Sequence, residues 1–142
     1  MKTESVLTVL LSRLSRVVYR RTSEELLGMP LKHFVALATL GVRSGVSQQE
    51  MGSLLLVDAN NLVILLNELE AAGFALRRRD PSDRRHHLVD ITPKGRQSLE
   101  RAERGIARVE DEVLGALSPN ERASLQRLLA KAIEGAPVGT PV

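Results

Sequence analysis

The feature that most limits how this chain can fold is the region from residue 47 to residue 95. The sequence signals of two successive helices are followed there by those of a β-hairpin. Ser47 and Glu50 have the Ser-x-x-Glu spacing of a capping box, which predicts that a helix begins there. Asp58 is an N-cap candidate for a second helix, because its carboxylate can accept from a backbone N–H of the first turn. Residues 54–57 leave room for only one helix end and a short turn between the two helices.

The second helix is predicted to bury one face. Four leucines recur at the i, i+3, i+4, i+7 spacing of a single helical stripe: Leu62, Leu65, Leu66 and Leu69. Gly73 then stands where a left-handed residue commonly ends a helix. Phe74 and Leu76 begin a strand, so the chain leaves the second helix directly for a β-hairpin.

The hairpin is strongly basic around its turn. Asp80-Pro81-Ser82-Asp83 suits a type I turn, with Asp at the first position and Pro at the second. Five arginines and two histidines flank it: Arg77, Arg78, Arg79, Arg84, Arg85, His86 and His87. Two short helices in tandem followed by a basic hairpin describe a winged helix-turn-helix. A solvated charged hairpin is the plainer interpretation, but the position after a helix-turn-helix favours DNA contact.

Arginine suits the narrow minor groove of A·T-rich DNA, where the negative potential is enhanced. Asp83, two residues before Arg85, can hold that guanidinium in one direction.

The wing sequence resembles the DNA-binding lobe of the MarR (multiple antibiotic resistance regulator) family. The signature is Asp80-Pro81-Ser82-Asp83-Arg84-Arg85, a hydrophobic strand, and then Leu88-Val89-Asp90-Ile91-Thr92-Pro93-Lys94-Gly95. With the helices on either side, the resemblance covers nearly the whole chain. It implies that the helix at 58–72 enters the major groove and that Arg85 enters the minor groove. It also implies a homodimer.

The groove face of the predicted recognition helix departs from the family pattern. Many members carry Ser, Thr or Arg there, whereas this chain has Ala59, Asn60, Asn61, Val63 and Ile64. Base readout is therefore expected to depend on the two asparagines, which can pair with adenine, and on Ile64, which can meet a thymine methyl group. The predicted DNA-binding set is Ser47, Gln48, Ala59, Asn60, Asn61, Ile64, Arg78, Asp83, Arg84, Arg85 and His86.

Before this region the sequence predicts two further helices. An apolar stripe of helical period runs from about Glu4 to Thr22, and another from Leu31 to about Arg43. The segment between Thr22 and Pro30 is predicted to be a break. Val46 is predicted to pair with the hairpin as a third, very short strand.

After the wing, Thr92 and Pro93 read as the N-cap and first residue of a long helix. Its apolar residues advance by three and four, as in a coiled-coil seam: Leu99, Ala102, Ile106, Val109 and Val113. Gly105 indicates either close packing or a bend. Ser118-Pro119-Asn120-Glu121 is a capping box that begins the last helix.

The predicted fold is mainly α with a small antiparallel β-wing, about six helices and two or three short strands in one domain, 1–142. Within it we expect a winged helix-turn-helix lobe at 31–92, a helical dimerisation region at 1–27 and 93–135, and a flexible tail at 136–142. Dimerisation is expected because the lobe cannot cover three further apolar helix faces, and exposed leucine stripes are costly. Packing of the three helices within one chain is the alternative.

Composition limits the other classes of function. No apolar run approaches the roughly 20 residues of a membrane span, and no signal peptide is expected. The absence of cysteine excludes disulfides, Cys-ligated zinc and thiol redox sensing, which fits the cytoplasm. We find no nucleophile with a partner base, no phosphate-binding glycine loop and no metal-ligand spacing. Neither a cofactor nor catalysis is therefore expected.

Two groups of side chains have alternative interpretations. Arg16, Tyr19 and His33 are candidates for a ligand site, but ordinary helix packing explains His33 at least as well. His86 and His87 point to opposite faces of a strand, so a shared metal ion is disfavoured against phosphate or solvent contact.

The predicted function is a dimeric, sequence-specific DNA-binding transcriptional regulator. We expect a repressor that binds a pseudo-palindromic operator and is released by a small aromatic or anionic ligand. The alternative is a ligand-independent regulator controlled by abundance or by a protein partner. A small hydrolase or metal-dependent enzyme would need a convergent polar site that the sequence does not show.

Overall fold

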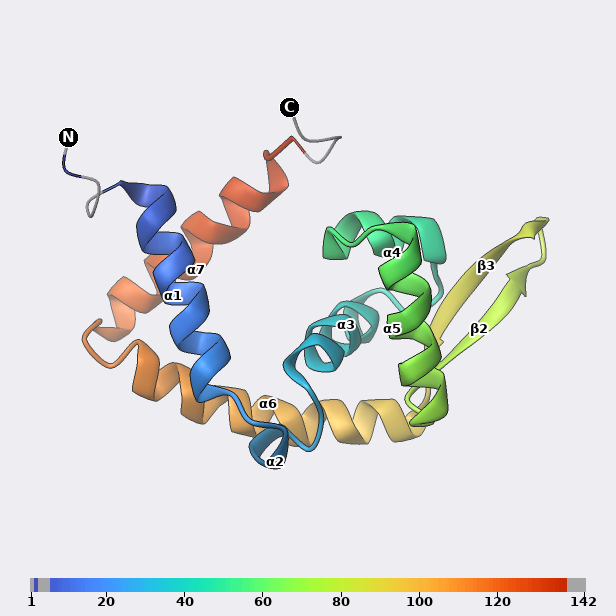
Figure 1. Cartoon of the computed structure of the whole chain (residues 1–142), viewed down its shortest axis with the longest axis horizontal. Coiled ribbons are helices and arrows are strands. Elements are labelled where there is room, and N and C mark those ends of the chain that lie inside the picture. The colour runs from blue at the N-terminus through green and yellow to red at the C-terminus, as the bar shows by residue number, and fades with distance from the viewer. Residues whose placement is uncertain (1, 3–5, 138–142) are drawn as a thin grey trace. The chain divides into compact units, whose positions relative to one another are not determined.

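The computed structural model describes residues 2 and 6–137, and is mainly helical with one small antiparallel sheet (Figure 1). Its elements in chain order are α1 (Leu7–Arg21), α2 (Glu24–Leu27), α3 (Leu31–Val42), β1 (Val46–Ser47), α4 (Gln48–Leu55), α5 (Ala59–Ala71), β2 (Ala75–Asp80), β3 (Asp83–Ile91), α6 (Pro93–Val113) and α7 (Pro119–Glu134). The predicted fold class is confirmed.

The chain divides into two compact units, which we call the winged lobe and the terminal unit. The winged lobe is Ser23–Gly105, and the terminal unit is Met1–Thr22 with Ile106–Val142. The predicted lobe, 31–92, lies within the unit Ser23–Gly105, which also contains α2 and most of α6, and its bounds stay a prediction. The assignment of 1–27 and 93–135 to dimerisation stays a prediction.

The helix-turn-helix begins as predicted, but its first cap is only half of a capping box. The Ser47 hydroxyl accepts from the backbone N–H of Glu50 at 3.0 Å and so caps α4. The Glu50 carboxylate does not complete the box, because it forms an ion pair with Arg43 at the end of α3. That salt bridge ties α3 to α4, which the reciprocal cap would not have done.

The second helix agrees with the prediction in its start, its buried face and its end. The Asp58 carboxylate accepts from the backbone N–H of Asn61 at 2.8 Å and caps α5. All four leucines of the predicted stripe are buried. Gly73 follows the helix with a φ of 78°, in the left-handed region. The chain then turns at once into β2, and the backbone N–H of Phe74 donates to Leu69.

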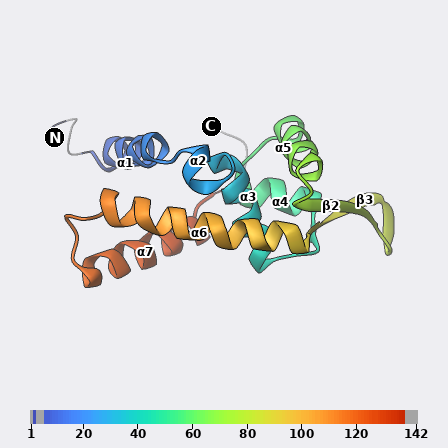
Figure 2. The same ribbon diagram turned by 90° about the horizontal axis from the view of Figure 1, so that it is seen from below.

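The sheet has the strand order β1-β3-β2 and is antiparallel throughout. Val46 pairs with Val89, which confirms the predicted third strand. The β2–β3 hairpin extends away from the helices of the winged lobe as a two-stranded wing (Figures 1 and 2). Its turn is at Pro81-Ser82, where Asp80 accepts from both the backbone N–H and the hydroxyl of Ser82, and these bonds lower the pKa of Asp80.

The core of the winged lobe is aliphatic. Its largest fully buried side chains come from α2, α3, α4, α5 and β3: Leu27, Leu37, Leu40, Met51, Leu66, Leu69 and Val89. The stretch Glu24–Val42 is long and apolar enough, with a mean hydropathy of 1.2, to cross a membrane by composition alone. Three of these core leucines lie in it, and about a third of the stretch is buried.

The segment predicted as a break contains the short helix α2, which the sequence interpretation missed. Ser23 caps it by accepting from the N–H of Leu26 at 3.1 Å, and Gly28 ends it with a φ of 79°. The same segment explains Gly105 on α6. A Cβ at Gly105 would lie 3.0 Å from the Leu26 carbonyl oxygen and 3.0 Å from a Leu27 methyl carbon. Gly105 therefore serves close packing of α6 against α2.

The terminal unit is built from α1, the end of α6 from Ile106 onward, and α7. The predicted capping box at Ser118 is confirmed, with reciprocal bonds of 3.2 and 2.9 Å to Glu121. No described residue of α1 or α7 is buried. The predicted helix start near Glu4 lies outside the described residues, which begin α1 at Leu7, and most of the predicted tail, from residue 138, also lies outside them.

Candidate nucleic-acid interface

The most distinctive polar arrangement is at the end of the wing, where Asp83 holds Arg85 by two side-chain bonds. Arg85 Nε donates to Asp83 Oδ1 at 3.0 Å, and Arg85 Nη2 donates to Asp83 Oδ2 at 3.0 Å. The Arg85 backbone N–H also donates to Oδ1, at 3.2 Å. The Arg85 side chain remains 86% exposed, so the pairing orients the guanidinium without hiding it.

The electrostatics of this pair keep both groups charged. Hydrogen bonds from the Arg85 side chain and backbone hold the pKa of Asp83 at about 2, below its ordinary 3.8, and His86 contributes a smaller effect. The same side-chain bond raises the pKa of Arg85. The result is a fixed, outward positive group at the end of an extended hairpin, as the spacing of the two residues predicted.

His86 is the second partner of Asp83, with Nδ1 3.0 Å from Oδ2. The imidazole therefore braces the same carboxylate, and its DNA-binding role stays a prediction. Among the described residues, no group of three His, Cys, Asp or Glu side chains has the geometry of a metal site.

The other wing arginines differ in whether their side chains already form hydrogen bonds or ion pairs. Arg78 Nε donates to Asp90 Oδ2 at 2.7 Å, so its charge is partly balanced within the sheet. Arg79 Nη1 donates to the carbonyl of Arg84 at 2.6 Å, across the hairpin. The Arg84 side chain is exposed and forms no hydrogen bond or ion pair with the described residues. Arg84 is thus better placed than Arg78 to meet a phosphate.

Arg77 has a structural role that the sequence interpretation missed. From β2 it forms an ion pair with Glu70 and a hydrogen bond with the Asn67 side-chain oxygen, both on α5. These contacts fasten the base of the wing to α5. Their partners are 7 and 10 residues from Arg77, and no local spacing rule indicates such a pair.

The predicted readout residues of α5 are exposed, and Ile64 is 54% exposed. They are not equivalent, however. Asn61 Nδ2 donates to Asp58 Oδ2 at 2.9 Å, so the Asn61 side chain braces the N-cap of its own helix. Asn60 is exposed beside Ala59 in the same first turn, and its amide has no hydrogen-bond partner among the described residues.

The two predicted contacts from α4 are at its beginning. Ser47 is half-buried, and its hydroxyl is occupied as the N-cap. Gln48 is also half-buried, and its Oε1 is buried without a hydrogen-bond donor among the described residues. Backbone N–H groups at a helix start can bind a phosphate. The backbone of both residues therefore remains a candidate for contact with a DNA phosphate.

The predicted ligand residues lie on two different helices. His33 on α3 is buried, and its Nε2 is 2.6 Å from Glu68 Oε2 on α5. Lys32 also binds Glu68, at 3.2 Å, and the bonds from His33 and then Lys32 lower the pKa of Glu68. His33 thus joins α3 to α5, which is the helix-packing role given above as the alternative to ligand binding. Arg16 and Tyr19 are exposed on α1, and their ligand-binding role stays a prediction.

Comparison with known proteins gives concordant results. The family model described as "MarR family" matches residues 29–87. A putative transcriptional regulatory protein for the hcr operon of Thauera aromatica is 34% identical over 87 residues, which are 61% of this chain and 52% of that protein. The chain thus spans about half the length of that relative.

Two further similarities extend over nearly the whole chain. The HTH-type transcriptional repressor Rv2887 of Mycobacterium tuberculosis is 29% identical over 130 residues, covering 90% of this chain and 94% of the repressor. The solved structure of the transcriptional repressor CouR bound to a 23-mer DNA duplex is 31% identical, with a TM-score of 0.80 and coverage of 92% and 96%. The wing, the helix-turn-helix and these similarities together show that the chain belongs to the MarR family of DNA-binding transcriptional regulators.

Proposed function

We propose that this protein is a dimeric repressor that binds a pseudo-palindromic operator and is released from it by a small aromatic or anionic ligand. The observation that carries the DNA-binding part is the exposed Arg85 guanidinium, fixed by Asp83 at the end of the wing. CouR, a repressor bound to DNA, has the same fold at 31% identity and supports repression as the direction of regulation. We place this activity in the cytoplasm.

The winged lobe supplies two different contacts to one DNA half-site. α5 enters the major groove with its exposed first turns, and the wing reaches the adjacent minor groove, where Arg85 meets the negative potential of an A·T-rich tract. Arg84 neutralises a phosphate. Because Asp83 already holds the guanidinium of Arg85, little side-chain entropy is lost when that group enters the groove.

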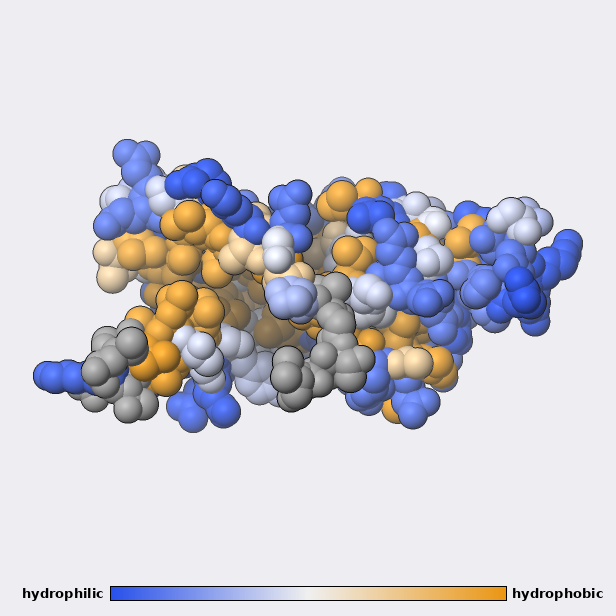
Figure 3. Space-filling view, turned by 90° about the horizontal axis from the view of Figure 1, so that it is seen from above, coloured by the Kyte–Doolittle hydropathy of each residue, from blue (hydrophilic) through white to orange (hydrophobic). Residues whose placement is uncertain are grey.

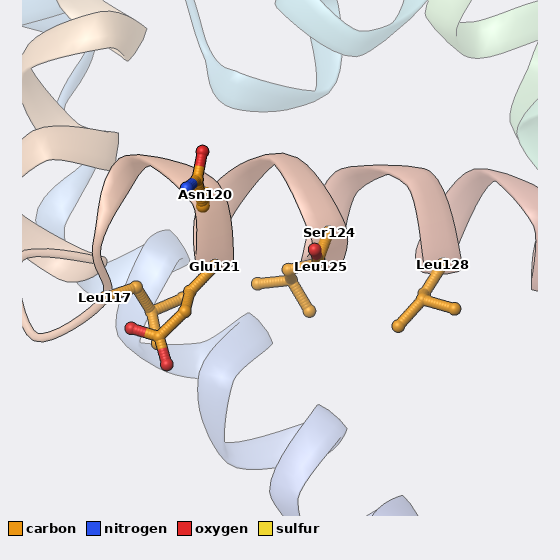
Figure 4. Close-up of a pocket in the computed structure, with 6 residues that line it drawn as sticks. All are labelled: Leu117, Asn120, Glu121, Ser124, Leu125 and Leu128. Atoms are coloured by element: carbon orange, nitrogen blue, oxygen red, sulfur yellow. The ribbon is translucent and has the colours of Figure 1, made fainter.

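The terminal unit provides the surface for dimerisation. Leu7 and Leu11 on α1 are 69% and 45% exposed, and Leu128 and Ile133 on α7 are 53% and 69% exposed. α7 also borders an open groove lined by Leu117, Asn120, Glu121, Ser124, Leu125 and Leu128, and Figure 4 shows the side chains of Leu125 and Leu128 on the same side of the helix.

Hydrophobic residues gather on the part of the molecule that contains the terminal unit, whereas the wing end is hydrophilic (Figure 3). Each leucine or isoleucine that becomes fully buried contributes about 1.5–3 kcal/mol, so a few such side chains can hold a dimer. A two-fold pair then presents two winged lobes to two half-sites.

Ligand release follows from the same arrangement. Two lobes must keep a fixed separation to fit two half-sites, so a ligand that prefers another separation weakens DNA binding. Arg16 and Tyr19 offer a cation and an exposed aromatic ring on α1. A ligand-independent repressor is the second candidate, and it is favoured by the engagement of the His33 side chain with Glu68.

Replacing Arg85 by alanine tests the wing contact. Arg85→Ala is expected to weaken operator binding by about 1–3 kcal/mol per subunit while the fold is retained, because the side chain is exposed. It also removes the main cause of the low pKa of Asp83, so that pKa should rise from about 2 toward its ordinary 3.8. Fluorescence anisotropy measures the affinity, and an NMR titration measures the pKa.

The matched control is Arg127→Ala, which removes the same charge from an exposed position on α7. Equal losses of affinity in both variants would mean that Arg85 acts only through net charge. Full affinity in a folded Arg85→Ala protein would refute the wing contact.

Placing a charge in the apolar face of α1 tests the dimer. Leu11→Glu is expected to shift the protein to monomers or unfolded chain and to abolish tight operator binding, because a buried carboxylate is unfavourable at an apolar interface. Val42→Glu, at an 86% exposed position in the winged lobe, is the control and should leave the dimer intact. A folded, monomeric wild-type protein at micromolar concentration in light scattering would contradict the proposal.

Titration of the operator complex with a panel of aromatic acids tests ligand control. A tenfold loss of operator affinity requires about 1.4 kcal/mol of coupling. The effect should weaken in Arg16→Ala, which removes the cation, and in Tyr19→Phe, which removes the hydroxyl. If no acid changes operator affinity or raises the melting temperature, the ligand-independent candidate replaces this part of the proposal.

A further inference from the structure

The exposed face of α5 is unusual for a helix that enters DNA, because it carries no positive charge. No lysine or arginine occurs from Ala59 to Ala71. Two of the exposed residues are instead apolar, Val63 at 39% and Ile64 at 54% exposure. The side chains of α5 therefore supply no positive charge to attract phosphates, whereas the wing carries five arginines.

The polar side chains of α5 are largely occupied within the winged lobe. Asn61 binds Asp58, Asn67 and Glu70 bind Arg77, and Glu68 binds His33 and Lys32. Asn60 alone among these polar residues has a side chain without a hydrogen-bond partner in the described parts of the chain. The helix period places Asn60 with Val63 and Ile64 on one face, opposite the buried leucines.

A face of this composition can recognise only some base pairs. In the major groove the C5-methyl group of thymine is the apolar feature, and an asparagine amide can pair with N6 and N7 of adenine. Strong guanine recognition needs an arginine or lysine at O6 and N7. α5 offers the first two kinds of contact and lacks the third.

We propose that α5 reads A·T pairs, with Val63 and Ile64 in contact with thymine methyl groups and Asn60 hydrogen-bonded to adenine. This inference rests on the proposed entry of α5 into the major groove. It adds the class of base that the helix selects. The half-site is then A·T-rich under both α5 and the wing, and the helix contributes specificity through methyl contacts and the Asn60 hydrogen bond.

Deoxyuridine substitution isolates the methyl contact. An operator is first obtained by selection from random DNA, and each thymine of a half-site is then replaced singly by deoxyuridine, which keeps the base pairing and removes only the methyl group. At one or two positions per half-site, the wild-type dimer should lose about fourfold in affinity, the equivalent of one buried methyl-sized group.

Variants then assign the contact to side chains. Ile64→Ala and Val63→Ala should each remove the deoxyuridine sensitivity at one position, because the methyl group has lost its partner. Val42→Ala, which shortens an exposed valine on α3, should keep the full sensitivity. Circular dichroism and melting temperature show that each variant is folded.

The outcomes separate this inference from the proposed function. Sequence-specific binding that ignores every deoxyuridine, or that keeps its sensitivity in both Ile64→Ala and Val63→Ala, would overturn the inference and leave the operator proposal in place. Unchanged operator affinity in Ile64→Ala would mean that another partner covers this face and would also overturn it. Failure to bind any selected DNA would overturn the proposed function itself.

Discussion

The position of α5 depends first on the burial of its leucine stripe, and the remaining features of the interface depend on that position. Gly52 on α4 permits the close contact, since a Cβ there would lie 3.2 Å from a Leu62 methyl carbon. Burial alone leaves some freedom to slide and rotate. Polar contacts limit this freedom: His33 binds Glu68, and Arg77 binds both Asn67 and Glu70 on α5. The base of the wing is therefore joined directly to the recognition helix.

This surface divides its tasks between two elements of different chemistry. The wing holds the positive charge. The Asp83 carboxylate orients the Arg85 guanidinium by accepting two hydrogen bonds from it. α5 carries no basic residue and exposes the apolar side chains of Val63 and Ile64. Affinity would then come mainly from the wing, with the salt dependence expected of phosphate contacts, and discrimination between bases mainly from α5.

Contacts between residues close in sequence were predictable, and contacts set by tertiary packing were not. The N-cap at Asp58 and the pairing of Asp83 with Arg85 span two or three residues, so local geometry alone determines them. The Glu50 carboxylate was assigned to the wrong partner, because the nearness of Arg43 depends on how α3 packs. The pairing of Arg78 with Asp90 likewise requires the register of the hairpin. Helix α2 was missed because Gly28 and Pro30 are typical of a break between helices. The Ser23 N-cap, which does begin a short helix there, was given less weight.

In the proposed mode of binding, two winged lobes related by a two-fold axis read one operator. Sequence selection from random DNA, combined with the mass of the resulting complex, tests it most directly. The predicted result is an inverted repeat whose half-sites are about one helical turn, roughly 10–10.5 base pairs, apart, bound by two chains per duplex. Enrichment of a single unrepeated site bound by one chain, or no enrichment at all, would contradict the account.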